Sequence, residues 1–179
     1  MQDLQEVEWQ FDALDVRPVS RWLEGESWGP DPAVARGESR EISDRYCDTE
    51  DWRIYRAGYA LRIRSTDGQE VEATMKRLAP ADGLSGLMRR REISEPLDVA
   101  DPETLKYAPG PVGDMVRALT GPGALRQLFE VRTRRSTHGL LLDGFRAGEV
   151  ALDETAIPVE EEAEPVRLRR VEVEVEPEG

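Results

Sequence analysis

The stretch Val171-Glu172-Val173-Glu174-Val175-Glu176, close to the end of the sequence, alternates valine and glutamate. Strict alternation is typical of a β-strand, because successive side chains of a strand point to opposite faces. One face of this strand would carry carboxylates and the other β-branched side chains. Carboxylates spaced roughly 7 Å apart on one face repel each other, so this face should meet either bulk water or cations.

A second acidic stretch lies near the other end of the sequence. Residues 4–11 read as a strand with Glu6 and Glu8 on one face and Val7 and Trp9 on the other. A single run of this kind is most often the solvated face of an antiparallel sheet. Two such runs would form a divalent-cation site if their strands lie close together, and carboxylates suit magnesium, manganese or calcium far better than zinc.

Length and composition limit the classes of protein. The 179 residues are expected to form one domain, residues 1–179, with room for a core. The net charge of -13 weighs against binding to nucleic acid or anionic membranes. No apolar run is long enough to span a bilayer and no signal-peptide pattern is present, so we expect a cytoplasmic protein.

The lone Cys47 and His138 argue against thiol or imidazole metal sites, and His138 is expected at a surface turn.

Cations replace carboxylates in the middle strands. Two strand-like stretches flank Asp67-Gly68, a strong hairpin signal, and carry basic and apolar residues in alternation. Two later stretches show a similar mixture. The basic residues expected on polar strand faces are Arg62, Arg64, Lys76, Arg91, Arg132 and Arg134.

Three further strands are expected over residues 128–136, 139–145 and 149–155. A turn at Ala147-Gly148 would join the last two into a hairpin. Asp153 lies on the polar face of the last strand and adds another carboxylate.

The fold class predicted from these elements is α+β, mainly β, with short helices packed outside an antiparallel sheet. If the apolar faces met in a sandwich, all charged faces would contact water. If the sheet instead closed into a barrel, one face would have to line the lumen. A lumen with charges of both signs would be costly to bury dry, so it should be wet and bind a ligand.

These patterns together resemble the CYTH domains, also called triphosphate tunnel metalloenzymes, along nearly the whole chain. Each motif alone is weakly specific, but their order and spacing are specific. The motifs are Glu6-Val7-Glu8, Tyr46-Cys47-Asp48-Thr49, residues 57–64, Ala73-Thr74-Met75-Lys76, Arg90-Arg91-Glu92, Val131-Arg132-Thr133-Arg134, residues 150–154, and the glutamates Glu172, Glu174 and Glu176.

The resemblance implies a closed antiparallel β-barrel of eight or nine strands around a hydrophilic triphosphate tunnel. Family members bind a linear, nucleoside or thiamine triphosphate and act with Mg²⁺ or Mn²⁺. Several hydrolyse the terminal phosphate, and one branch cyclises ATP to cyclic AMP. Some bacterial relatives carry a following CHAD domain, implicated in polyphosphate binding, which these residues do not show.

For this chain we predict a metal-dependent triphosphatase. Because a triphosphate carries several negative charges, it needs fixed cations. Divalent ions held by carboxylates would neutralise the bridging oxygens and orient a water. The predicted catalytic residues are Glu6, Glu8, Glu172 and Glu174, the metal ligands are Glu6, Glu8, Asp153, Glu172 and Glu174, and the phosphate-binding residues are Arg62, Arg64, Lys76, Arg91, Arg132 and Arg134.

The substrate is expected to be inorganic tripolyphosphate, or otherwise a nucleoside or thiamine triphosphate. A non-catalytic polyphosphate-binding module and an adenylyl cyclase are the alternatives. The family's first motif ends in lysine where this chain has Gln10, which brings no charge and favours the binding module. The expected partners are small triphosphates or polyphosphates, without nucleic acid or membrane, in a monomer or homodimer.

Overall fold

The computed structural model describes residues 3–25, 33–67, 70–78, 87–159 and 163–175, and for residues 3–7, 70 and 87–91 it describes the backbone alone. The strands are β1 (Asp3–Asp12), β2 (Ala33–Asp48), β3 (Tyr59–Thr66), β4 (Glu70–Arg77), β5 (Leu87–Pro96), β6 (Arg126–Leu142), β7 (Phe145–Ile157) and β8 (Val166–Val175). The helices are α1 (Arg17–Leu23), α2 (Arg53–Arg56), the 3₁₀ helix η1 (Pro102–Lys106) and α3 (Pro111–Thr120). The predicted mainly β fold with few short helices is confirmed.

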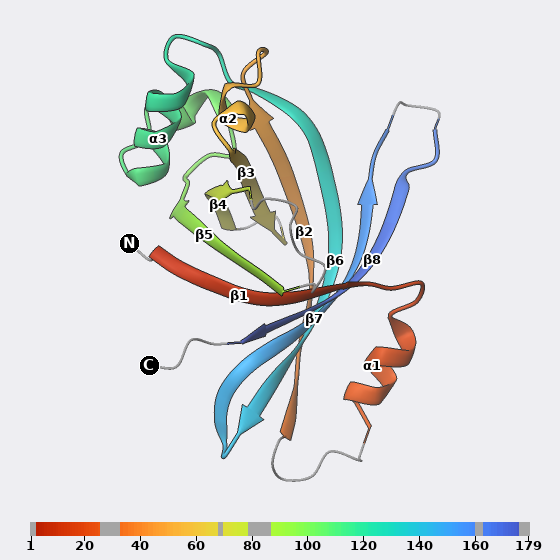
Figure 1. Ribbon diagram of the computed structural model, residues 1–179. Coiled ribbons are helices and arrows are strands. Elements are labelled where there is room, and N and C mark those ends of the chain that lie inside the picture. The colour runs from red at the N-terminus through yellow and green to blue at the C-terminus, as the bar shows by residue number, and fades with distance from the viewer. Residues whose placement is uncertain (1–2, 26–32, 68–69, 79–86, 160–162, 176–179) are drawn as a thin grey trace.

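All strand pairs are antiparallel, in the order β1-β5-β4-β3-β2-β6-β7-β8 (Figure 1). β1 pairs with β5 through residues 3–9 and with β8 through residues 8–12, which closes the sheet. The acidic stretches from the two ends of the sequence therefore lie on adjacent strands. This adjacency is the condition under which we expected them to form a shared site.

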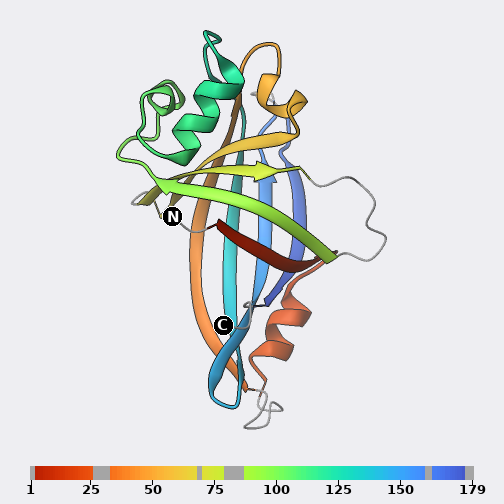
Figure 2. The same ribbon diagram turned by 60° about the vertical axis from the view of Figure 1, so that its left-hand side comes forward.

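The helices cover the outside of the sheet at two places. Figures 1 and 2 show α2 and α3 at one end of the sheet and α1 at the other. Beneath α2, η1 and α3 lies an apolar cluster that includes Ile54, Leu61, Ile63, Met75 and Val116. A smaller cluster under α1 consists of Val16, Leu23, Val150 and Leu152. The apolar strand faces thus pack outward under helices, and the alternate residues point into the interior. No helix in the described part of the chain is long and apolar enough to cross a membrane.

Two of the expected strands form one. β6 runs without interruption from Arg126 to Leu142, and the hairpin turn is at Asp143-Gly144, where φ is 52° and 80°. The turn predicted at Ala147-Gly148 is therefore wrong. Gly148 instead lies in β7, where a Cβ atom would come within 2.3 Å of the Glu174 carbonyl oxygen. The expectation of a surface turn at His138 is also wrong, because this side chain is buried in the middle of β6.

A buried carboxylate fixes α3 to the sheet. Glu95 of β5 accepts hydrogen bonds from the backbone N–H groups of Val112 (3.1 Å) and Gly113 (3.2 Å), in the first turn of α3. Those N–H groups have no partner within the helix, so Glu95 acts as a cap supplied from a distant strand.

Replacing Glu95 with alanine should therefore lower the free energy of unfolding by roughly 1–3 kcal/mol, because two buried donors lose their acceptor. Urea denaturation followed by circular dichroism measures the change. The matched control is Glu103→Ala, an exposed glutamate in η1, which should change the stability by less than about 0.5 kcal/mol. Equal stabilities for the two variants would contradict the capping role.

Candidate functional site

The interior of the sheet contains a cavity of about 370 Å³ that is lined by side chains from all eight strands. Its charged residues are balanced in sign. The cations are Arg62, Arg64, Lys76, Arg135 and Arg170, and the carboxylates are Glu8, Asp44, Glu92, Asp153 and Glu172.

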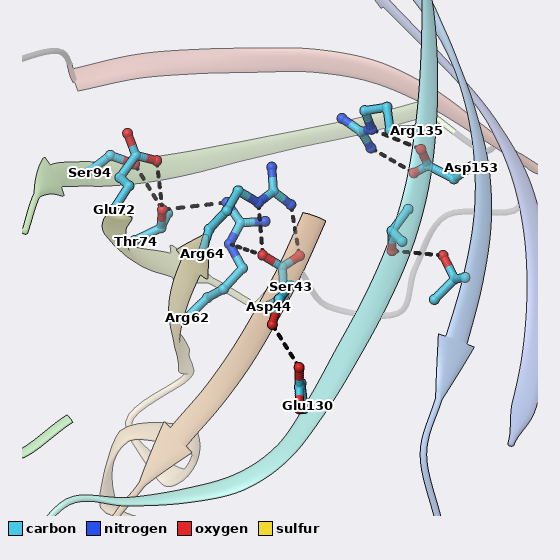
Figure 3. Close-up of polar contacts among 12 residues, drawn as sticks. Ser43, Asp44, Arg62, Arg64, Glu72, Thr74, Ser94, Glu130, Arg135 and Asp153 are labelled. Atoms are coloured by element: carbon cyan, nitrogen blue, oxygen red, sulfur yellow. Dashed lines mark hydrogen bonds and ion pairs between the residues drawn. The ribbon is translucent and has the colours of Figure 1, made fainter. Parts of the chain in front are cut away.

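One wall of the cavity, formed by β3 and β4, carries three of the cations. Arg64 makes two hydrogen bonds of 2.8 Å to the carboxylate of Asp44, and Arg62 approaches the same carboxylate at 3.8 Å (Figure 3). Burial opposes the charge of Arg64, but the hydrogen bonds to Asp44 outweigh it and raise the pKa of the guanidinium. Lys76 pairs with Glu92. The buried Nε of Arg62 has no hydrogen-bond partner, so this wall retains a donor for an anion.

Arg135 of β6 joins two carboxylates from neighbouring strands. It donates to both oxygens of Asp153 (2.8 and 2.7 Å, Figure 3) and to Glu172 (2.6 Å). Burial disfavours its charge, yet these two partners raise the pKa of the guanidinium above its ordinary value. Arg135 therefore stays charged and holds β6, β7 and β8 together inside the cavity.

A row of carboxylates crosses three strands beside Arg135. Glu174 of β8 is the register partner of Glu8 on β1 and of Glu149 on β7. These residues, with Glu172 and Arg135, line a second cavity of about 20 Å³, which is enough space for one water-sized particle. Partial burial, and next Glu149, raise the pKa of the Glu174 carboxyl. Like charges placed directly opposite each other destabilise a sheet unless a cation lies between them.

Gln10 occupies the position next to this row. Its side-chain amide donates to Glu8 (2.7 Å) and to Glu172 (3.2 Å). The glutamine thereby positions two carboxylates of adjacent strands without adding a charge.

The carboxylate row fits a divalent cation by the chemistry of its donors. Hard oxygen donors on adjacent strands are the ligands that Mg²⁺, Mn²⁺ or Ca²⁺ requires. Among the described side chains, however, no three such groups are close enough to hold a metal as they stand. Arg135 holds Glu172 and Asp153 in ion pairs. A bound cation would need these side chains to turn toward the small cavity.

Most of the predicted site residues with described side chains lie together. Glu8, Asp153, Glu172, Arg62, Arg64 and Lys76 line the large cavity, and Glu174 lines the small one. The side chains of Glu6 and Arg91 and the whole of Glu176 lie outside the described residues, although the backbones of Glu6 and Arg91 belong to the β1–β5 pair.

The placement of Arg132 and Arg134 in the lumen is wrong. Their side chains are 66% and 64% exposed on the outer face of β6, and Arg132 pairs with Glu130 at 3.1 Å. The inward residues of β6 are Phe129, Val131, Thr133 and Arg135.

Sequence reasoning also missed five charged residues that line the two cavities. Asp44 shares its strand face with Tyr46, and Glu92 belongs to the motif Arg90-Arg91-Glu92, so both could have been found from the motifs. Glu149 shares its strand face with Asp153, so alternation could have found it as well, whereas for Arg135 alternation left open which face of β6 lies inward. The residues missed are Asp44, Glu92, Arg135, Glu149 and Arg170.

Fold and cavities together define a closed antiparallel sheet with a charged interior, suited to hold an anion and a cation side by side. The comparison with known families agrees with this class. The CYTH domain matches residues 24–179, so the chain belongs to the CYTH family.

Solved structures with the same fold have low sequence identity. A candidate adenylyl cyclase from Hippeastrum, described as revealing a dominant triphosphatase activity, is 17% identical, with a TM-score of 0.68 over 94% of this chain and 79% of that chain. A candidate adenylate cyclase from Bacillus halodurans is 20% identical, with a TM-score of 0.65 over 97% of this chain and 82% of that chain. A protein from Pyrococcus horikoshii OT3 is 18% identical, with a TM-score of 0.53 over 97% and 79%. No curated protein matches the sequence.

Replacing Glu174 with glutamine should stabilise the metal-free protein slightly. A raised pKa means that the ionised carboxylate is less favourable in the folded than in the unfolded state, so stability is lost as the pH rises through that pKa. Because water still reaches much of the partly buried side chain, the expected rise in the thermal midpoint at pH 7 is on the order of 1 °C. The difference should vanish below the ordinary carboxyl value of 4.5. Glu164→Gln, on an exposed loop, is the control, and a lower midpoint for Glu174→Gln at pH 7 would refute crowding of the carboxylates.

Proposed function

We propose that this CYTH protein hydrolyses the terminal phosphate of a linear triphosphate in the charged cavity, together with a divalent cation. The observation that carries the proposal is the cavity itself, in which fixed cations face a row of crowded carboxylates. The CYTH family acts on small-molecule triphosphates and commonly includes triphosphatases and cyclases. The overall negative charge of the protein makes this local group of cations the place where a polyanion can bind.

The anion would bind first to the wall formed by β3 and β4. In the closed strand order this wall lies opposite β7 and β8, which carry carboxylates. The Nε of Arg62, which lies 3.8 Å from Asp44 and makes no hydrogen bond, can donate to the anion, while Arg64 and Lys76 exchange their carboxylate partners for phosphate oxygens. Such an exchange keeps the positive charges of Arg64 and Lys76 paired in the low-dielectric interior.

Arg135 and Arg170 take the phosphate-binding roles first given to Arg132 and Arg134. Both line the cavity, and Arg170 lies 4.0 Å from Glu172 and 3.6 Å from Asp12. When Arg135 turns toward phosphate, it releases Glu172 toward the small cavity. Asp153, which holds two of the Arg135 nitrogen atoms, is then best described as a positioning residue.

Glu8, Glu149, Glu172 and Glu174 would hold the cation, and Glu6 remains a predicted ligand. CYTH metalloenzymes generally use divalent metals. The bound cation would neutralise charge on the transferring phosphoryl group. Gln10 fixes the orientation of Glu8 and Glu172. Water attacks the terminal phosphorus, the P–O bond to the bridging oxygen breaks, and phosphate, the shortened chain and a proton are released.

Two alternatives give different products. A non-catalytic polyphosphate-binding module is favoured by the neutral Gln10 and would bind tripolyphosphate without cleaving it. An adenylyl cyclase would release pyrophosphate and cyclic AMP from ATP.

The deciding experiment uses metal-free protein with tripolyphosphate and either Mg²⁺, Mn²⁺ or no metal, and follows phosphate release. We expect turnover that requires the divalent ion, and weak but measurable calorimetric binding of the anion in its absence. Binding without metal-dependent turnover would select the binding module. Failure of tripolyphosphate to bind, with or without the metal, would overturn the assignment of the cavity as a triphosphate site.

Two arginines of the same strand form a matched pair that tests which face of β6 holds phosphate. Arg135→Ala should lower kcat/KM by roughly 10- to 100-fold, as expected for a lost charged hydrogen bond to phosphate, whereas Arg132→Ala should stay within about two-fold. Arg135→Lys keeps the charge but loses the bidentate contact, and should recover part of the kcat/KM lost in Arg135→Ala. Thermal midpoints of all three variants separate catalysis from folding, and equal losses for both alanine variants would contradict the lumen assignment.

A further inference from the structure

We infer that Asp44 competes with the bound anion for Arg64 and Arg62, so that its carboxylate limits the affinity of the cavity for anions and helps the product to leave. The inference rests on the proposed function and deepens it. It assigns Asp44 to the exchange of anions and not to the binding of the cation.

Asp44 is held in the lumen by the cations of a neighbouring strand. It lies on β2 as the register partner of Arg64 on β3, and only 5% of its surface is exposed. Its two oxygens accept hydrogen bonds from Nε and Nη2 of Arg64, each at 2.8 Å, and the Nε of Arg62 lies 3.8 Å away (Figure 3). In the described part of the chain, Asp44 makes no ion pair with any other residue.

The carboxylate of Asp44 occupies the place on Arg64 that a phosphate would take. A guanidinium presents parallel N–H groups that bind a carboxylate or a phosphate in the same bidentate geometry. Among the described side chains, Arg64 donates hydrogen bonds to Asp44 alone. Arg62 differs, because Thr74 holds its Nη2 at 3.4 Å while its Nε makes no hydrogen bond. An anion can therefore bind to Arg62 first, and it must displace Asp44 to reach Arg64.

Asp44 is separate from the carboxylate row that fits a cation. The row lies on β1, β7 and β8, and in the strand order β6 and β7 lie between β2 and β8. Asp44 lines the large cavity but is not among the residues that line the small one. Glu174 is placed opposite other carboxylates, whereas Asp44 faces two guanidinium groups. Its surroundings are those of a counter-ion for cations.

Displacement of Asp44 has an energetic cost that is recovered when the product leaves. A buried carboxylate that loses its guanidinium partner stays charged in an interior with little water. The contacts of the incoming anion have to offset this cost. Tripolyphosphate has one phosphate group more than pyrophosphate and can contact Lys76 as well as the arginines of β3. After hydrolysis each fragment makes fewer contacts, so Asp44 regains Arg64 and the fragments dissociate.

The test is the replacement Asp44→Asn, which keeps the shape of the side chain and removes its charge. Without the competing carboxylate, the metal-free variant should bind tripolyphosphate and pyrophosphate about ten-fold more tightly than the wild type, because the anion no longer displaces a charged hydrogen bond. Calorimetry measures both affinities. Inhibition of hydrolysis by added pyrophosphate should strengthen about ten-fold as well. Weaker or unchanged binding would overturn the inference, because a residue that only positions the arginines loses affinity when it is replaced.

Thermal midpoints and a matched control separate competition from other effects. Asp44→Asn leaves Arg62 and Arg64 without a buried counter-ion, so its midpoint without anion should fall, and pyrophosphate should raise the midpoint more than in the wild type. The control Glu130→Gln makes the same change in net charge but removes the partner of Arg132 on the outer face of β6. Its affinities should stay within about two-fold of the wild type. Tighter binding in the control as well would refute competition at Asp44.

Two further outcomes are decisive. If Asp44→Asn does not fold alone, it is refolded with pyrophosphate, which should restore the folded protein, and a failure to do so would contradict the inference. If the wild type binds tripolyphosphate without hydrolysing it, the proposed hydrolysis fails, but the calorimetric comparison still decides the role of Asp44. If neither the wild type nor the variant binds these anions, the inference is wrong together with the assignment of the cavity.

Discussion

The closure of the sheet through β1 determines where every charged side chain of the strands can lie. Because β1 pairs with both β5 and β8, each strand has one face toward the lumen and one toward the helices or water. Alternation then requires that valines and leucines on one side are matched by arginines and carboxylates on the other. The charged lumen and the apolar outer clusters are therefore two consequences of the same pattern.

The side chains that stabilise the fold and those that form the candidate site lie on opposite faces of the sheet. The apolar clusters under α1 and under α2 and α3 supply most of the favourable burial, since ion pairs in an interior contribute little net stability. The lumen can therefore keep like charges close together at Glu174 and leave the Nε of Arg62 without a hydrogen-bond partner. Such groups cost folding free energy and are expected where a ligand completes the site.

Alternation in the sequence was sufficient to predict the mainly β fold, but it left open whether the charged faces point outward or into a lumen. The inward direction of Glu8, Arg62, Arg64 and Glu172 followed only from the resemblance to the CYTH domains. In β6, alternation grouped the residues correctly, because Glu130, Arg132 and Arg134 share one face. That face is the outer one, and Arg135 on the inner face is the partner of Asp153. Since both faces of β6 carry arginine, the local pattern does not decide which of them lies inward, and an error of one residue exchanges the two faces.

The charges of the lumen are balanced, so a single charged ligand would disturb this balance. The five cations and five carboxylates of the large cavity leave it close to neutral, and most of the cations are paired. A polyanion entering alone would add uncompensated negative charge beside Glu8 and Glu172, and a divalent cation entering alone would compete with Arg135 for its carboxylates. In the proposed function the arginines would move to the anion and Glu8 and Glu172 to the cation, so that the charges of the two ligands compensate each other. Under this proposal Arg135 would couple the binding of the two ligands, because its movement to phosphate would free Glu172 for the metal.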